Sequence, residues 1–187
     1  MIIIGITGTL GAGKGTVVEY LVGKKGFVHF SVRNYLAEVI KSQGKELNRD
    51  TMVVTANELR NRNGPGFIIE ELYHKAESTG KNCVIESIRT PGEIEKLRGK
   101  DNFYLLAVDA DINTRYERIK LRGSETDNVS FEIFQQNENR EMHSDDPNKQ
   151  NLSECIRQAD FVILNDNTIK DLHIKTEEVL KKISNQT

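Results

Sequence analysis

Short apolar runs separated by amphipathic stretches recur along almost the whole chain. Five mainly apolar runs of four to six residues occur at 2–7, 27–30, 83–87, 103–108 and 161–165. Near-continuous apolarity, rather than alternation, is typical of strands that are covered on both faces of a sheet. Strands that alternate with helices favour parallel pairing. The pattern therefore predicts a three-layer α/β fold with a five-stranded parallel sheet.

Apolar residues at helical spacing fill the intervals between these runs. A helix is expected over 14–22, and another over 169–183, where apolar side chains recur every three or four residues. Thr90 with Glu93 and Thr168 with Asp171 have the spacing of helix-capping pairs. We expect helices to begin at both places.

Two stretches are longer than a simple crossover requires. Residues 31–80 have room for two or three helices, and residues 123–150 are polar, with seven acidic and two basic side chains. Both are expected to be helical insertions at one edge of the sheet, although 123–150 is also compatible with a flexible surface loop. No boundary between domains is indicated, so residues 1–187 are expected to form a single domain.

A glycine-rich turn directly follows the first predicted strand and precedes the first predicted helix. Residues 8–16 read GTLGAGKGT, which matches a phosphate-binding (Walker A) loop in the context that such a loop requires. Glycines let backbone amides point at anionic oxygens, and the lysine reaches the β- and γ-phosphates. The residues expected to bind ATP phosphates are Gly8, Gly11, Ala12, Gly13, Lys14, Gly15 and Thr16. A dinucleotide-binding turn is excluded, because Thr16 stands where its third glycine belongs and no carboxylate ends the second strand.

The order G-K-G-T, with Gly15 after the lysine, resembles adenylate kinase and its nucleoside monophosphate kinase relatives. Residues 84–91, VIESIRTP, are similar to the stretch in those kinases where a strand ends in an acidic residue and an arginine follows. The resemblance implies a P-loop NTPase fold in which 31–80 binds the acceptor and 123–150 forms a lid. It also implies that Thr16 and Glu86 hold Mg²⁺ and that Arg89 binds the acceptor phosphate. Asp109 is a rival for the metal role, or it caps the next helix together with Asp111.

A basic face is expected on the helix over 112–122, where Arg115, Arg118 and Arg122 follow one another at helical spacing. Such a face is either solvated or directed at phosphates. Guanidinium groups stabilise the charge that spreads over a transferring phosphoryl group. The kinase resemblance implies catalytic roles for Lys14, Arg89, Arg118 and Arg122, with Gly123 as a hinge.

Candidate acceptor ligands are scattered along the chain. Ser31 and Arg33 follow the second strand, Arg60 lies near the end of a later helix, and Arg89 completes the set. Asn165, after the last strand, resembles the loop that borders the adenine in dephospho-coenzyme A kinase. Alternatively, this segment is a turn that needs no ligand.

Net charge limits the range of partners. The chain has 26 Lys and Arg against 28 Asp and Glu, which disfavours a nucleic-acid or polybasic membrane partner. No apolar run approaches the ~20 residues that span a bilayer, and no export signal is visible. Cys83 and Cys155 are expected to be reduced thiols. We expect a cytoplasmic protein whose partners are small nucleotides.

These features predict an enzyme that uses ATP and Mg²⁺ to transfer the γ-phosphate to a small nucleotide, a (deoxy)nucleoside monophosphate. A hydroxyl acceptor, as in dephospho-coenzyme A kinase, is the alternative, and it needs a positioned carboxylate such as Glu86 or Asp109. The third possibility is a module that binds a nucleotide without transferring phosphate. The chain also resembles kinase-like domains associated with deoxycytidylate deaminases, but it lacks the H-x-E and P-C-x-x-C residues of zinc deamination.

Overall fold

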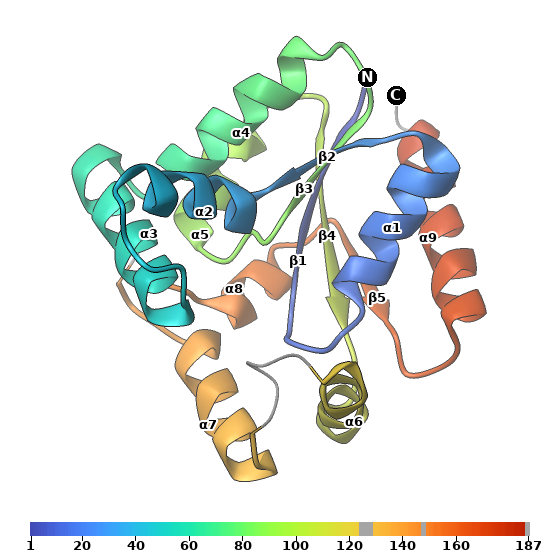
Figure 1. Ribbon diagram of the computed structural model, residues 1–187. Helices are drawn as coiled ribbons and strands as arrows, with labels where there is room; N and C mark the ends of the chain where they lie inside the picture. The colour runs from blue at the N-terminus through green and yellow to red at the C-terminus, as the bar shows by residue number, and fades with distance from the viewer. Residues whose placement is uncertain (124–128, 147–148, 186–187) are drawn as a thin grey trace.

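A five-stranded, all-parallel sheet forms the centre of the computed structural model, which describes residues 1–123, 129–146 and 149–185 (Figure 1). The strand order is β2-β3-β1-β4-β5. The strands are β1 (Ile3–Gly8), β2 (Val28–Ser31), β3 (Cys83–Glu86), β4 (Phe103–Asp109) and β5 (Phe161–Leu164). The predicted α/β fold and parallel sheet are confirmed, and each strand lies within two residues of its predicted range.

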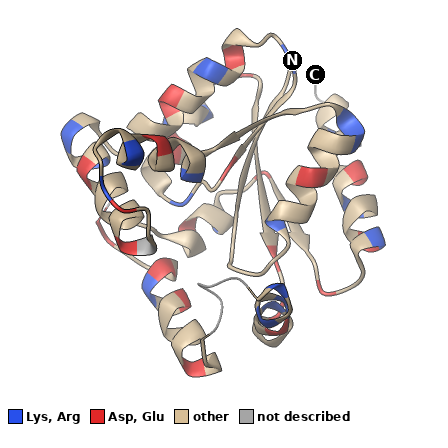
Figure 2. Cartoon of the chain, in the orientation of Figure 1, with Lys and Arg blue, Asp and Glu red and all other residues tan. Residues whose placement is uncertain are grey.

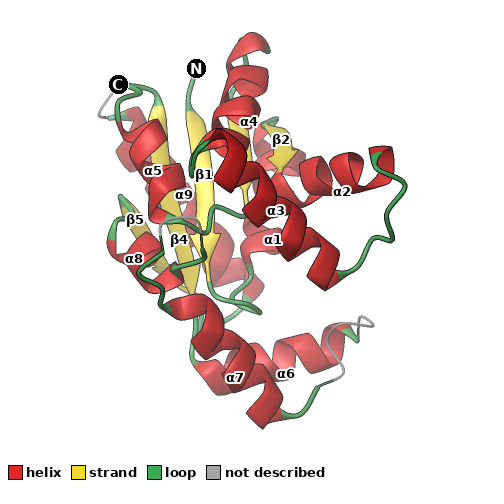
Figure 3. Cartoon of the chain, turned by 90° about the vertical axis from the view of Figure 1, so that its left-hand side faces the viewer, coloured by secondary structure: helices red, strands yellow, loops and turns green. Residues whose placement is uncertain are grey.

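Helices cover both faces of the sheet. One face carries α1 (Lys14–Lys25) and α9 (Ile169–Ser184). The other carries α2 (Val32–Ser42), α3 (Arg49–Asn63), α4 (Phe67–Ser78), α5 (Pro91–Arg98) and α8 (Leu152–Arg157). Two further helices, α6 (Ile112–Arg122) and α7 (Phe131–Met142), lie beyond the carboxyl ends of the strands (Figures 1 and 3). Within the described ranges, no helix is both long and apolar enough to cross a membrane.

Alternating side chains of β1 divide the core into two parts. Ile4 and Ile6 pack with the apolar side chains of α1 and α9, whereas Ile3 packs with those of α4 and α5. Because each strand residue faces the opposite layer from its neighbour, both faces of the central strand must be apolar. This explains why the sequence shows continuous apolarity here.

Both predicted capping pairs are present. Thr90 caps α5 and Thr168 caps α9, and each forms a reciprocal capping box with the acidic residue three positions later. These interactions satisfy backbone N–H groups that the first helical turn leaves without partners. The starts of α5 and α9 are therefore determined locally.

The described parts of both long insertions contain helices. Residues 31–80 form α2, α3 and α4 beside the β2 edge of the sheet, and residues 131–142 form α7. Within the second insertion, residues 124–128 and 147–148 lie outside the described part. The polar composition of 123–150 thus does not prevent a helix, because Phe134 provides a buried anchor on α7.

Strand pairing places the chemistry-bearing residues at one edge. Ile6 of β1 is paired with Glu86 of β3, and Gly8 of β1 is paired with Val108 of β4. The glycine-rich turn, the loop after β3 and the loop after β4 therefore leave the sheet together, as expected for the carboxyl ends of parallel strands.

Candidate functional site

The glycine-rich turn connects β1 to α1 in a conformation that only glycine adopts easily. Gly8 has φ 129° and Gly13 has φ 100°, both in the left-handed half of backbone space. A Cβ atom on Gly8 would lie 1.9 Å from the carbonyl oxygen of Val108, and one on Gly13 would lie 2.4 Å from Nδ2 of Asn165. Backbone geometry and close packing therefore both require glycine at these positions.

Lys14 bends back over this turn. Its Nζ donates hydrogen bonds to the carbonyl oxygens of Gly8, at 2.9 Å, and Thr9, at 2.6 Å. Desolvation and, to a lesser extent, the charge of Arg89 lower the pKa of Lys14 to about 7, while the charges of Glu86 and Glu141 oppose the shift. Lys14 is thus the centre of a charged cluster, and an arriving anion would raise its pKa.

Glu86 ends β3 beside this lysine. Its Oε2 lies 2.9 Å from Nε2 of His29. The hydrogen bond with His29 lowers the pKa of Glu86, and the charges of His29, Lys14 and Arg89 act in the same direction. The carboxylate is therefore ionised near neutral pH.

The oxygen-bearing side chains beside Lys14 have the donor chemistry that a magnesium ion requires. Among the described residues, no group of three or more His, Cys, Asp or Glu side chains forms a complete metal cage. Mg²⁺ does not require one, because it is usually bound through one or two protein oxygens together with substrate phosphates and water. The hydroxyl of Thr16 on the first turn of α1 and the carboxylate of Glu86 are oxygen donors of the right type.

Asp109 supports the glycine-rich turn. Its Oδ1 accepts hydrogen bonds from Oγ1 of Thr9, at 2.5 Å, and from the backbone N–H of Ala110, at 2.9 Å. Asp111 caps α6, accepting from the N–H groups of Asn113 and Thr114. The capping role that the sequence offered to Asp109 therefore belongs to Asp111.

Arg89 contacts the far end of α7. Its Nη1 donates to Oε2 of Glu141, at 2.9 Å, and to Oε1 of Gln150, at 2.8 Å. Its backbone N–H donates to Oε2 of Glu93, at 2.9 Å. The backbone of Arg89 is thus held by α5, and its guanidinium group is held by residues of the second insertion.

Arg115, which sequence reasoning placed only on a general basic face, is buried between three segments. It donates to the carbonyl oxygens of Ala110, at 2.7 Å, and Leu10, at 3.3 Å, and both terminal nitrogens contact the carboxylate of Glu138 on α7. This side chain therefore joins the loop after β4, the glycine-rich turn and α7.

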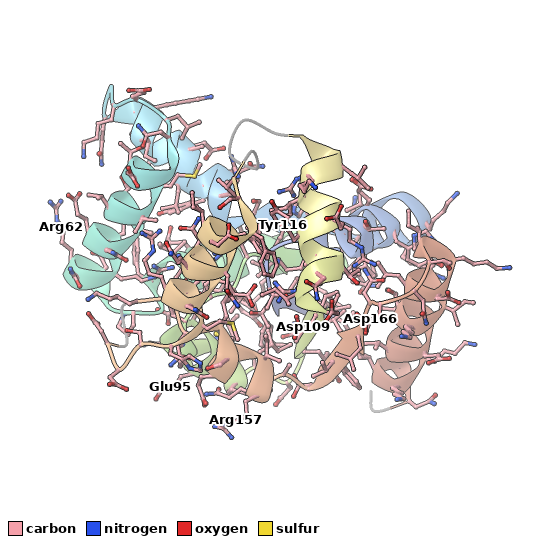
Figure 4. The ribbon with its side chains drawn as sticks, turned by 90° about the horizontal axis from the view of Figure 1, so that it is seen from below. Arg62, Glu95, Asp109, Tyr116, Arg157 and Asp166 are labelled. Atoms are coloured by element: carbon pink, nitrogen blue, oxygen red, sulfur yellow. The ribbon has the colours of Figure 1, made fainter. Side chains whose placement is uncertain are left out.

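An aromatic contact completes the junction of α6 with α7. The ring of Tyr116 lies 5.6 Å from that of Phe134 and 5.2 Å from that of Phe131, measured between centroids. In Figure 4, which looks onto this end of the molecule, Tyr116 lies between the two helices and Asp109 lies at the base of α6. Figure 2 shows that both helices carry acidic and basic positions.

The three arginines of α6 have different surroundings. Nη2 of Arg118 donates to the carbonyl oxygen of Asn167, at 3.4 Å, so this side chain is directed at the loop between β5 and α9. Arg122 is exposed at the last position of α6, before Gly123, which ends the helix with φ 60°. Of these three arginines only Arg115 is buried, so they do not form the single basic face that was expected.

Two of the four expected acceptor ligands are accessible near the β2 edge. Ser31 caps α2, and Arg33 lies exposed on the first turn of that helix.

The expectation that Arg60 binds the acceptor is wrong. Its side chain is 4% exposed, and its Nη2 lies 2.7 Å from Oε1 of the fully buried Glu93, so the guanidinium group is not presented to a ligand. Arg62 points outward at the edge of α3 (Figure 4).

Asn165 is buried behind the glycine-rich turn. Its Nδ2 donates to the carbonyl oxygen of Ala12, at 2.8 Å. Asn165 therefore supports the turn from the buried side. Together with Asp109 and Arg115, it fixes the turn at three points. For the contact between Arg115 and Glu138, the sequence contains one indication, the excess of acidic residues in 123–150. Which acidic residue pairs with which arginine is seen only in the structure.

Comparison with known proteins agrees with this geometry. The family model AAA_18, described as an AAA domain, matches residues 4–144, a range from β1 past the end of α7. The chain belongs to this AAA domain family. Across its full length it is 29% identical over 188 residues to UPF0200 protein MJ1399 of Methanocaldococcus jannaschii, with 99% of this chain and 92% of the relative covered.

Two solved kinases show the same fold as this AAA domain. Shikimate kinase from Bacteroides thetaiotaomicron superposes with a TM-score of 0.55 at 18% identity, covering 96% of this chain and 98% of that chain. Dephospho-CoA kinase from Campylobacter jejuni superposes with a TM-score of 0.53 at 15% identity, covering 97% and 96%. The architecture of this chain is thus the one seen in these two kinases.

Proposed function

We propose that this chain transfers the γ-phosphoryl group of ATP to a small nucleotide, a (deoxy)nucleoside monophosphate. The observation that carries the proposal is the position of Lys14. Its ammonium group lies over the glycine-rich turn, near Glu86 and Arg89, and donates hydrogen bonds to the backbone carbonyls of Gly8 and Thr9. A lysine at the start of a helix is well placed to bind a polyphosphate, whose negative charge would raise the lowered pKa of Lys14 and keep it protonated.

The roles of the remaining residues follow from this placement. The amides of residues 8–16 and Lys14 would bind the β- and γ-phosphates, and Thr16 and Glu86 would hold Mg²⁺, which neutralises phosphate charge when bound. Arg89 would bind the transferred or accepting phosphate, and Arg118 and Arg122 would stabilise charge near the donor. Ser31 and Arg33 are the accessible groups for the acceptor. Alignment and electrostatics would supply the catalysis, because an acceptor phosphate is already anionic.

Transfer to a hydroxyl is the second candidate, and the position of the Glu86 carboxylate beside Lys14 supports it. A hydroxyl acceptor needs a carboxylate that can accept its proton. Hydrogen bonding to His29 keeps Glu86 ionised, and Glu86 lies beside Lys14, whereas Asp109 Oδ1 is already bonded to the turn. Glu86 is therefore the better of the two carboxylates that the sequence offered for this role.

A panel of acceptors tests the proposal. ADP formation is measured with MgATP and individual ribo- and deoxyribonucleoside monophosphates, dephospho-coenzyme A, and a no-acceptor control. One acceptor should raise turnover at least tenfold, and Lys14→Met should lower that rate about 10²–10³-fold, as loss of a charge-stabilising donor does in other enzymes. Lys24→Met, at the exposed end of the same helix, is the matched control and should leave turnover unchanged.

Each other outcome has a defined meaning. Activity with dephospho-coenzyme A alone would replace the monophosphate acceptor by a hydroxyl. Binding of MgATP by calorimetry together with a flat panel would favour a nucleotide-sensing module. Absence of MgATP binding by the folded chain would rule out both enzyme and sensor.

A further inference from the structure

Helix α7 directs two carboxylates at the arginines around the glycine-rich turn. Glu138 contacts Arg115, and Glu141, one turn later on the same helix, contacts Arg89. Phe134 is buried on the same side of α7, and its ring packs against Tyr116 of α6. The orientation of α7 is thus set by an apolar anchor as well as by its charges.

The two ion pairs differ in how exposed they are. Arg115 and Glu138 are enclosed by α6, the turn and α7, and Arg115 makes two further hydrogen bonds to carbonyl oxygens. The side chains of Arg89 and Glu141 are 32% and 12% exposed. Arg89 is therefore accessible to a solute, whereas Arg115 is not.

A guanidinium group binds a carboxylate and a phosphate with the same planar fork of N–H donors. Glu141 and a phosphoryl group are therefore alternative partners for the guanidinium group of Arg89, whose Nη1 donates to Glu141 and to Gln150. The charge of Glu141 also acts on Lys14, where it favours the protonated form of the ammonium group. Glu141 thus interacts with Arg89 and, through its charge, with Lys14, the two cationic groups that the proposed reaction needs for binding phosphate.

We propose that Glu141 determines how strongly this site binds a phosphoryl anion, because it occupies Arg89 until the anion replaces it. The inference rests on the proposed function in one respect, namely that Arg89 faces the phosphoryl group. Anion binding exchanges the Arg89–Glu141 contact for an Arg89–phosphate contact, while Phe134 and the Glu138–Arg115 pair keep α7 in place. The affinity measured for the anion is reduced by the free energy of breaking the internal pair.

Calorimetric titration with inorganic pyrophosphate tests this inference. Glu141→Gln keeps the shape of the side chain and removes its charge, so pyrophosphate should bind about three- to tenfold more tightly than to the unchanged chain. Glu141→Ala, which removes the hydrogen bond as well, should shift the affinity in the same direction. Glu132→Gln is the matched control, since Glu132 lies in the first turn of α7, where it interacts with the Ser130 cap, and it should leave the affinity unchanged.

A double-mutant cycle separates competition at Arg89 from a general change in charge. Arg89→Met should weaken pyrophosphate binding, and adding Glu141→Gln to Arg89→Met should give no further gain. Equal tightening by Glu141→Gln with and without Arg89 would overturn the proposal, because the effect would then come from net charge alone. No tightening in either Glu141 variant would overturn it as well.

MgATP titration of the same proteins distinguishes the two proposals. If the unchanged chain binds MgATP and Lys14→Met does not, the nucleotide site stands whatever the Glu141 variants do. If neither protein binds MgATP, the proposed function fails. The pyrophosphate cycle then shows on its own whether Glu141 and an anion compete for Arg89.

Discussion

Two arginine–glutamate contacts near the loop after β3 use the same chemistry in different surroundings. Arg60 of α3 lies 2.7 Å from Glu93 of α5, and Arg89 lies 2.9 Å from Glu141 of α7. The first pair is 4% and 0% exposed, whereas the second is 32% and 12% exposed. Water and solutes can reach only the second, so the first is a permanent part of the fold and the second can exchange its partner.

The permanent pair also supports the exchangeable one. Glu93 accepts from Arg60 with Oε1, and with Oε2 it accepts from the backbone N–H groups of Arg89, at 2.9 Å, and Thr90, at 3.1 Å. Arg60 therefore acts on the site through Glu93. It holds in place the backbone from which the Arg89 side chain extends.

The largest effect is expected at the buried pair. Arg60→Met leaves the carboxylate of Glu93 without its cation in a dry environment, which should lower the free energy of unfolding by about 3–5 kcal/mol. Urea denaturation measures the change. Arg62→Met, two residues further along α3 and exposed, is the control and should stay within about 0.5 kcal/mol. A loss below 1 kcal/mol at Arg60 would show that burial does not separate the two pairs.

An intermediate effect is expected at Arg115, which is buried but bonded partly to neutral carbonyls. Arg115→Met removes charge-assisted hydrogen bonds to Glu138 and contacts to Leu10 and Ala110, and should cost about 1.5–3 kcal/mol. The same denaturation experiment applies. Lys120→Met, on the exposed side of α6, should have a much smaller effect. A cost at Arg115 larger than that at Arg60 would reverse the expected order.

Lys14 extends the comparison to a cation bonded to neutral carbonyls. Its pKa of about 7 means that the free chain has lost much of this charge by pH 8, whereas a bound polyphosphate favours the charged form. Binding of MgATP should therefore take up a proton above pH 7, and the affinity should fall by up to about tenfold per pH unit between pH 7.5 and 9. Below pH 7 this dependence should vanish.

Calorimetry in two buffers with different ionisation enthalpies measures the proton uptake. The expected uptake approaches one proton at pH 8 to 9 and is close to zero at pH 6. An affinity that does not change between pH 7.5 and 9 would contradict a neutral Lys14 in the free chain.

The smallest effect on stability is expected at the exposed pair. Arg89→Met should change the free energy of unfolding by less than about 1 kcal/mol, because partly exposed ion pairs contribute little to the fold. Denaturation of this variant alongside Arg60→Met gives the direct contrast. A loss of 3 kcal/mol or more at Arg89 would mean that this contact is structural, and the case for exchange with phosphate would weaken.

Local signals in the sequence accounted for the fold and for the glycine-rich turn. Continuous apolar runs gave the strands, the Thr90–Glu93 and Thr168–Asp171 spacings gave two helix starts, and the turn follows directly from residues 8–16. All of these depend on neighbours within a few positions along the chain. These features are visible in short segments of sequence, so they could be predicted without knowing the tertiary structure.

The partners of the arginines were not predictable in the same way. Arg60 and Glu93 are 33 positions apart, and Arg89 and Glu141 are 52 positions apart. Nothing in the immediate sequence of Arg60 distinguishes it from the exposed Arg62, because only tertiary packing determines which of the two is enclosed. The acidic excess of 123–150 was visible, but its effect on particular arginines depended on where α7 packs.

The supports of the glycine-rich turn bear on how the chain would meet its ligand. Asn165 holds Ala12 and Asp109 holds Thr9, so the turn is already shaped before an anion arrives. Little conformational entropy remains to be lost when the amides close around a polyphosphate, and preorganisation of this kind favours tight association. The nucleotide would enter a rigid receptor, and most of the adjustment would fall on a few long, charged side chains.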